Sequence, residues 1–133
     1  MIEERGLDKA VATSTVRDVA LKRLSFLGLI NRFQAIVGGD EVKEGKPDPA
    51  IYELAAERLG LTEMDRGRCI VLEDSEPGVQ AGRAAQMVVI MVRDPEFAPS
   101  DRERDSSLLV NKIFGDLLEV RTFLEDELLR SDV

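Results

Sequence analysis

The sequence predicts an α/β fold in which a parallel β-sheet is flanked by helices. Short apolar runs of four or five residues alternate along the chain with segments whose apolar residues recur at helical spacing. The runs are apolar on both faces, which is typical of strands covered by helices on both sides. The 133 residues match the size of one compact domain and are too few for two independent cores.

The first expected strand is Ala10–Thr13, and a helix is expected to follow it over Val16–Leu27. A Ser14/Thr15 cap precedes the helix, and Gly28 ends it where a left-handed residue is favoured. The expected core face consists of apolar residues at helical spacing, namely Val19, Ala20, Leu24 and Leu27.

The second expected unit joins a strand over Ala35–Gly38 to a helix over Pro49–Leu59. A loop over residues 39–48 separates them. Asp48 precedes the helix as a cap, proline suits its first position, and Gly60 ends it.

Two further strands are expected at Cys69–Glu73 and Val88–Val92, with a helix over Pro77–Gln86 between them. A loop with a solvated charge run is expected from Arg93 to Ser107. The tail repeats apolar residues at helical spacing over Asp116–Leu129 and predicts a closing amphipathic helix.

Composition excludes several classes of function. The formal net charge of -8 opposes nucleic acid and anionic lipid, so neither is expected as a partner. The chain has no histidine, which removes Ser-His-Asp and Cys-His catalysis and imidazole zinc sites. The single Cys69 cannot form an internal disulfide, and its apolar run favours burial over reactivity. The N-terminus is charged and no apolar run approaches ~20 residues, so a cytoplasmic location is expected.

Polar residues close or follow three of the expected strands, where ligands bind in open parallel sheets. Thr13 and Ser14 close the first strand, Lys46 lies in the loop after the second, and Glu73 and Asp74 close the third. Taken singly, these residues could be a helix cap, a solvated loop lysine and a second helix cap. Together, a hydroxyl, an ammonium and a carboxylate pair suit a phosphoryl group and a Mg²⁺ ion.

The chain resembles the haloacid dehalogenase superfamily, and within it the branch of β-phosphoglucomutase and phosphoglycolate phosphatase. The segments that carry the resemblance are Ala10–Ser14, Gly45–Pro49 and Val71–Ser75 with Gly78. The resemblance implies a Rossmann-like core in which Thr13 and Ser14 bind the transferring phosphoryl group. It also implies that Lys46 steadies the nucleophile and the phosphoryl charge, and that Glu73 and Asp74 help to hold Mg²⁺.

The first motif of this family, a strand bearing Asp-x-Asp with the nucleophile and the general acid and base, is absent. Asp8 is the only Asp before Thr13, and the helical cap domain is also missing. The family's sheet order places that strand in the centre, between the strands ending at Thr13 and Glu73. Its absence predicts a gap of roughly 9–10 Å with unpaired backbone groups on both sides.

We therefore expect a single partial core domain over residues 1–133. Residues 1–8 are a remnant of the cap or a linker, 9–95 carry the motifs, and 96–133 form a loop and the closing helix. Gln86 stands where the branch usually has glycine before the next strand.

Three outcomes remain open for the missing strand. The reading frame is truncated and the protein begins upstream, which we favour; or a second copy closes the edge as a homo-oligomer or strand-swapped dimer; or the strands adopt a new order.

The resemblance implies a phosphatase or phosphomutase that acts on a small phosphorylated metabolite through an aspartyl-phosphate. The 133 residues alone are expected to be inactive, and the alternative is an inactive half-domain or pseudoenzyme that persists as an oligomer.

Rival α/β folds are disfavoured by the order of the motifs. Phosphoacceptor receiver domains carry their acidic pair before the Thr or Ser and the Lys, whereas here Thr13 and Lys46 come first. The glycine-rich motifs of dinucleotide-binding and P-loop proteins do not occur. The identity of the substrate, and the choice between phosphatase and mutase, lie beyond the sequence.

Overall fold

The computed structural model describes residues 6–92 and 112–131. Its strands are β1 (Ala10–Ala12), β2 (Ala35–Val37), β3 (Ile70–Glu73), β4 (Val88–Val92) and β5 (Lys112–Phe114). Its α-helices are α1 (Arg17–Phe26), α2 (Ala50–Arg58), α3 (Glu76–Ala84) and α4 (Leu117–Ser131). Three short 3-10 helices, η1 (Ile30–Arg32), η2 (Gly39–Glu41) and η3 (Glu63–Arg68), complete the set.

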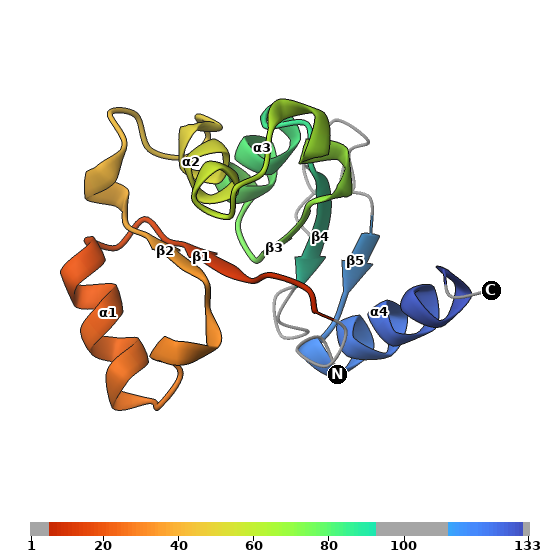
Figure 1. Ribbon diagram of the computed structural model, residues 1–133. Coiled ribbons are helices and arrows are strands. Elements are labelled where there is room, and N and C mark those ends of the chain that lie inside the picture. Colours follow the sequence, from red (N-terminus) through yellow and green to blue (C-terminus); the bar gives the residue numbers. More distant parts are fainter. Residues whose placement is uncertain (1–5, 93–111, 132–133) are drawn as a thin grey trace.

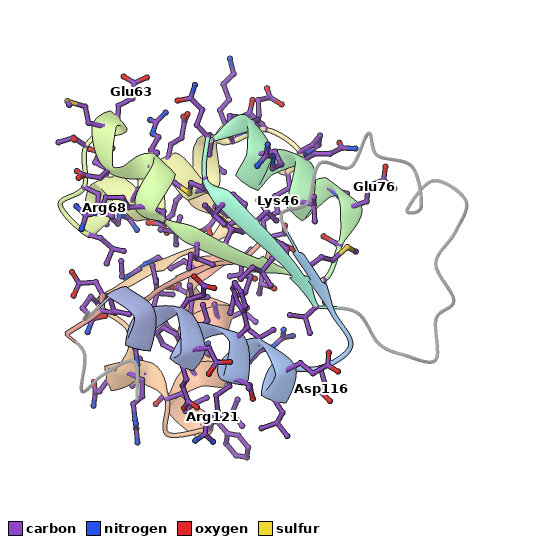
Figure 2. The ribbon with its side chains drawn as sticks, turned by 90° about the vertical axis from the view of Figure 1, so that its right-hand side faces the viewer. Lys46, Glu63, Arg68, Glu76, Asp116 and Arg121 are labelled. Atoms are coloured by element: carbon purple, nitrogen blue, oxygen red, sulfur yellow. The ribbon has the colours of Figure 1, made fainter. Side chains whose placement is uncertain are left out.

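The strands are parallel and form two sheets, one of order β1-β2 and one of order β3-β4-β5. Helices α2 and α3 cover one face of these strands, while α1 packs against β2 and α4 against β5 on the other face (Figure 1). Figure 2 shows α4, with Asp116 at its start and Arg121 one turn further, on the opposite side of the strands from α3. The predicted α/β class, a parallel sheet flanked by helices, is confirmed.

The core lies between the strands and the layer formed by α2 and α3. Its members are buried aliphatic residues of both layers, among them Val37, Ile51, Val79, Val89 and Met91. Within the described residues, no helix is both long enough and apolar enough to cross a membrane.

Cys69 lies just before β3 and is half-buried at the margin of the core. Burial raises the pKa of its thiol, and the nearby Asp65 carboxylate acts in the same direction. A protonated thiol is a weak nucleophile, so this environment agrees with a packing role.

The predicted helix boundaries hold within two residues, but the cap of α1 is not the predicted one. Neither Ser14 nor Thr15 caps the helix. Asp40, from the segment after β2, accepts a hydrogen bond from the Arg17 N–H at 2.7 Å. A cap supplied from 23 residues away leaves no mark near the start of the helix, so the local pattern pointed to the wrong residues.

Two expectations about burial were wrong. The expected core face of α1 is largely uncovered: Ala20 is buried, but Val19 and Leu27 are 39% and 62% exposed. On β3, Val71 and Glu73 are buried while Ile70 and Leu72 are 49% and 47% exposed. Helix α1 and strand β3 thus each expose apolar side chains that no other described residue covers.

Strand β5 was not predicted, because its three residues are too few for a recognisable alternation. Its register, with Ile90 opposite Lys112, places it on the outer edge of β4. The predicted loop from Arg93 to Ser107 falls outside the described residues.

Strands β1 and β3 do not pair with each other, so each has one edge without a neighbour among the described strands. The parallel strands therefore divide into two sheets between β1 and β3, where the resemblance predicts a central strand that this sequence lacks.

Candidate functional site

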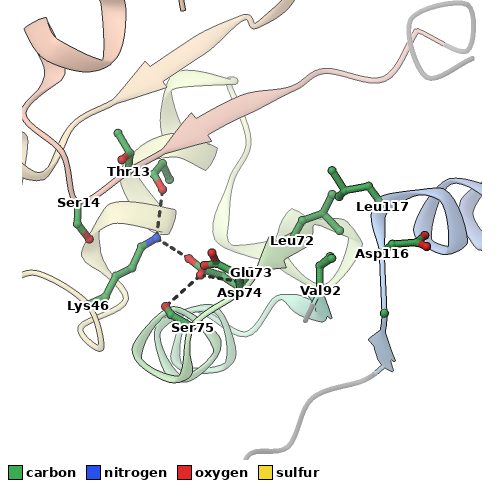
Figure 3. Close-up of a pocket in the computed structure, with 12 residues that line it drawn as sticks. Thr13, Ser14, Lys46, Leu72, Glu73, Asp74, Ser75, Val92, Asp116 and Leu117 are labelled. Carbon is green, nitrogen blue, oxygen red and sulfur yellow. Dashed lines mark hydrogen bonds and ion pairs between the residues drawn. The ribbon is translucent and has the colours of Figure 1, made fainter. Parts of the chain in front are cut away.

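A cavity of about 850 Å³ lies between the carboxyl ends of β1 and β3 (Figure 3). It is lined by Thr13, Ser14, Lys46, Glu73 and Asp74, together with Ser75 and Asp116. The topology thus brings all five of the predicted site residues to one place, although they come from three separate segments of the chain. Their individual roles remain predictions.

Lys46 connects the two sheets across this cavity. It lies in the loop between η2 and α2, and its ammonium donates to the Ala12 carbonyl at 3.2 Å and to Glu73 Oε1 at 2.5 Å. Ala12 ends β1 and Glu73 ends β3. The side chains of this ion pair are only 12% and 7% exposed, so water screens the attraction weakly.

Glu73 uses both carboxylate oxygens within the protein. Oε1 accepts from Lys46 and from the Tyr52 hydroxyl, and Oε2 accepts from the Asp74 N–H at 3.2 Å and the Ser75 hydroxyl at 3.3 Å. Burial by itself would raise the pKa of Glu73, but the hydrogen bonds from Lys46 and Tyr52 outweigh burial and hold the pKa below its usual value. Glu73 is therefore ionised at neutral pH.

The turn after β1 is held in place by close backbone contacts. Thr13 Oγ1 accepts the Thr15 N–H at 3.1 Å, and the Gly39 N–H donates to the Thr15 carbonyl at 2.9 Å. A Cβ on Gly39 would lie 2.4 Å from the Ser14 carbonyl oxygen, so only glycine fits against this turn. Because Thr13 Oγ1 acts as an acceptor toward Thr15, its O–H remains a donor that the cavity can use.

Asp74 differs from Glu73 in its surroundings. It is exposed at the cavity, and no described residue donates to its side chain in a hydrogen bond or pairs with it in a salt bridge. A carboxylate oxygen is a suitable ligand for Mg²⁺. In residues 6–92 and 112–131, however, no three Asp, Glu or Cys residues converge in a way that could hold a metal ion. Asp74 therefore fits as one ligand of an incomplete set.

Residues that sequence reasoning missed also contribute. Tyr52, buried on α2, reaches Glu73 with its hydroxyl, and the sequence around it gave no sign of this. Asp116 lines the cavity while its Oδ1 accepts the Glu119 N–H at the start of α4. An acidic residue before an apolar helical repeat marks such a cap, so this signal was available.

The electrostatics of the cavity are set by one lysine and three carboxylates among its described lining residues, which gives a formal charge of −2. A phosphate dianion would be repelled by that balance, whereas a divalent cation would offset it. The remaining wall is apolar and is formed by Ala12, Leu72, Val92 and Leu117. The cavity thus combines a polar end suited to a cation and an oxyanion with an apolar flank.

Comparison with sequence families gives one clear match: the model for haloacid dehalogenase-like hydrolases covers residues 1–92. A phosphorylated carbohydrates phosphatase from Thermotoga maritima is 43% identical over 63% of this chain and 38% of its own length. Hexitol phosphatase A from Escherichia coli is 36% identical over 78% of this chain and 46% of its own length. The chain thus spans less than half the length of these curated relatives.

Solved structures agree with the sequence relatives. A haloacid dehalogenase family hydrolase from Deinococcus radiodurans, with bound phosphate and sodium, superposes with a TM-score of 0.78 at 27% identity, over 94% of this chain and 55% of its own. A Thermotoga maritima protein assigned as a β-phosphoglucomutase gives 0.72 at 33% identity, over 85% of this chain and 50% of its own. The predicted resemblance to the haloacid dehalogenase superfamily is confirmed, and a β-phosphoglucomutase is among the similar structures.

Proposed function

Because the chain belongs to the haloacid dehalogenase-like hydrolase family, we propose that it supplies the phosphate- and metal-binding part of an active site that transfers a phosphoryl group from a small metabolite. The observation that carries the proposal is the cavity between β1 and β3, where two hydroxyls, an ammonium and an exposed carboxylate meet. The relatives include a phosphorylated carbohydrates phosphatase and a hexitol phosphatase. A phosphorylated sugar or sugar alcohol is therefore the favoured substrate class.

The chain's own groups would hold the phosphoryl oxygens. The Thr13 hydroxyl and the backbone N–H of Ser14 supply hydrogen-bond donors at the end of β1. The Lys46 ammonium has three N–H donors, of which Ala12 and Glu73 take two, so one remains for an oxygen in the cavity. Donors fixed before the substrate arrives stabilise charge that develops as the phosphoryl group moves.

Asp74 would be the Mg²⁺ ligand contributed by this chain, and Glu73 could contribute only by releasing donors that its oxygens now accept. When bound, Mg²⁺ would neutralise charge on the phosphoryl oxygens. The cavity's charge of −2 supports this assignment, because phosphate binding then depends on a cation.

The nucleophile must come from another segment, since no Asp-x-Asp occurs anywhere in the 133 residues. In the proposed reaction, an aspartate oxygen supplied at the gap bonds to phosphorus as the ester P–O bond breaks, and the second aspartate of the same motif gives its proton to the leaving alcohol. Water or a sugar hydroxyl then attacks the phosphorus and gives its proton to that second aspartate. The phosphoryl group departs as inorganic phosphate or a new phosphate ester, which restores the nucleophile's carboxylate. The role left to this chain is to bind and orient the group that is transferred.

The test measures binding and turnover on the 133-residue chain. We expect inorganic phosphate to shift the NMR signals of Thr13, Ser14 and Lys46 only when Mg²⁺ is present, and Asp74→Asn to abolish this coupling. Glu57→Gln, an exposed carboxylate on α2, is the matched control and should bind as the wild type does. Hydrolysis of sugar phosphates should stay at the level of the buffer.

Two results would contradict the proposal. Phosphate that binds equally well without Mg²⁺ would remove the metal role of Asp74. Robust Mg²⁺-dependent turnover by the chain alone, lost in Asp74→Asn, would show that no other segment is required.

A second reading is an inactive half-domain that persists as an oligomer, and the unpaired edges of β1 and β3 favour it. It predicts no coupling between Mg²⁺ and phosphate at the cavity. The binding experiment therefore separates the two readings.

A further inference from the structure

Tyr52 is a buried aromatic residue that contacts two residues of the candidate site. No sequence motif or spacing predicted a role for it. It lies in the first turn of α2 and is 8% exposed. Its hydroxyl donates to Glu73 Oε1, and its ring centroid lies 5.0 Å from Lys46 Nζ. Tyr52 thus contacts both members of the ion pair that joins the two sheets.

The carboxylate that Tyr52 contacts has little freedom to move. Ser75 and the Asp74 N–H hold Oε2, and a Cβ on Gly78 would lie 2.0 Å from the Glu73 carboxyl carbon, so the start of α3 closes against it. Tyr52 and Lys46 complete the enclosure at Oε1. Four donors on two oxygens define one orientation for the group.

Lys46, by contrast, is a flexible side chain whose ammonium must be held in one place to direct its third N–H into the cavity. The fixed Glu73 oxygen supplies one anchor, and the face of the Tyr52 ring supplies a cation–π contact. From these contacts we infer that Tyr52 is a positioning residue for Lys46, which it holds through Glu73 and through its own ring. The inference rests on the proposed function of Lys46. The claim that Tyr52 fixes the position of Lys46 can be tested without phosphate binding.

A purely structural role predicts something different. If Tyr52 only filled the core, the ring would suffice and the hydroxyl could be removed without effect on Lys46. Tyr52→Phe keeps the ring and removes the hydroxyl, so it separates the two roles. Thr122→Val is the control, because it removes a hydroxyl that bonds to the Leu118 carbonyl on the exposed α4.

The measurement is the exchange rate with water of the Lys46 ammonium protons, followed by ¹H–¹⁵N NMR of the 133-residue chain and assigned with Lys46→Met. We expect slow exchange in the wild type and in Thr122→Val, and exchange about tenfold faster in Tyr52→Phe, as for the loss of a hydrogen bond to a charged group. Thermal melting should confirm that both variants fold. Equal exchange in folded Tyr52→Phe and wild type would overturn the inference.

If Tyr52→Phe does not fold, the wild type still decides. A slowly exchanging Tyr52 hydroxyl proton, together with nuclear Overhauser contacts between the Tyr52 ring and the Lys46 side chain, supports the inference, and the absence of either overturns it. The same samples, titrated with inorganic phosphate and Mg²⁺, test the proposed function separately. Faster exchange in the variant with no phosphate response in either protein would retain the role of Tyr52 and reject phosphate binding.

Discussion

The ion pair between Lys46 and Glu73 is the contact on which the site geometry most depends. Each side chain is nearly buried, so each charge has lost most of its hydration and relies on the other. Removing one partner leaves a buried charge that nothing offsets. Removing both charges leaves no unpaired buried charge, so the stability lost is only that of the remaining polar contacts.

Lys46→Met should therefore lower the free energy of unfolding by about 3 kcal/mol. Adding Glu73→Gln to it should recover part of that loss, because the buried negative charge disappears. Lys43→Met, an exposed lysine in the same loop, is the control and should change stability by less than about 0.5 kcal/mol. Urea unfolding of the wild type, Lys46→Met, Glu73→Gln, the double variant and the control measures the coupling.

Additive effects of Lys46→Met and Glu73→Gln would contradict this account of the pair. They would mean that solvent reaches the two side chains and screens their charges.

Most residues of the site could be recognised from the sequence, because polar residues directly before or after apolar strands stand out from their surroundings. Thr13 and Asp74 were found in this way and Lys46 from its place in the loop that follows β2, and the structure places all three on one cavity. The contact of Glu73 with Tyr52 could not be found, since the two residues lie 21 apart in the chain and only packing of α2 against the strands brings them together.

At the scale of elements, the turn between α3 and β4 departs from the pattern of the family. Gln86 has φ 64°, in the left-handed region, where the branch usually has glycine. A side chain in this conformation costs about 1–2 kcal/mol, because Cβ crowds the following carbonyl. The hydrogen bond from the Met87 N–H to the Gly82 carbonyl at 3.1 Å closes this turn around the left-handed residue.

Gln86→Gly should accordingly raise the free energy of unfolding by about 1 kcal/mol. The control is Gln80→Gly in the middle of α3, which should lower it by about 1 kcal/mol, since glycine weakens a helix interior. Chemical denaturation of both variants gives the comparison.

If Gln86→Gly proves no more stable than the wild type, the left-handed conformation at this residue carries no strain. The two glycine substitutions are expected to change the free energy of unfolding in opposite directions. A non-specific effect of glycine would change it in the same direction in both variants.

The elements also show where local sequence reasoning stops. Strands β1 to β4 and the four α-helices were predicted with errors of a residue or two, because hydrophobic periodicity and the terminating residues Gly28 and Gly60 are local signals. The cap of α1 by Asp40 and the pairing of β5 with β4 depend on distant partners. Neither of these contacts can be predicted from the hydrophobic periodicity of the segment in which it occurs.

At the scale of the whole molecule, β1 and β3 each have one unpaired edge, and α1 and α4 lie on the face of the strands opposite α2 and α3 (Figure 1). Ile70 and Leu72 on β3, Val19 on α1 and Leu117 on α4 are all substantially exposed. Edges of this kind pair readily with other chains.

We expect the isolated chain to self-associate as its concentration rises, which light scattering at several concentrations would detect. Ile70→Lys should shift the equilibrium toward the monomer, because it places a charge on the exposed face of β3. Met64→Lys, at a residue that is 93% exposed on η3, is the control and should leave association unchanged.

A wild-type chain that stays monomeric at every concentration would contradict the argument from unpaired edges. Equal effects of the two lysine substitutions would assign the association to net charge alone.

The sequence by itself determined the α/β class, the order of most elements, the motifs that resemble the family and the segments that line the cavity. The elements follow from local periodicity, and the motifs from residue types at and after strand ends, which do not depend on distant partners. Only the tertiary structure decided that Lys46 joins β1 to β3, that Tyr52 and Glu73 fix it, and that the parallel strands divide into two sheets. Contacts between residues far apart in the chain arise from packing, and packing is a property of the folded whole.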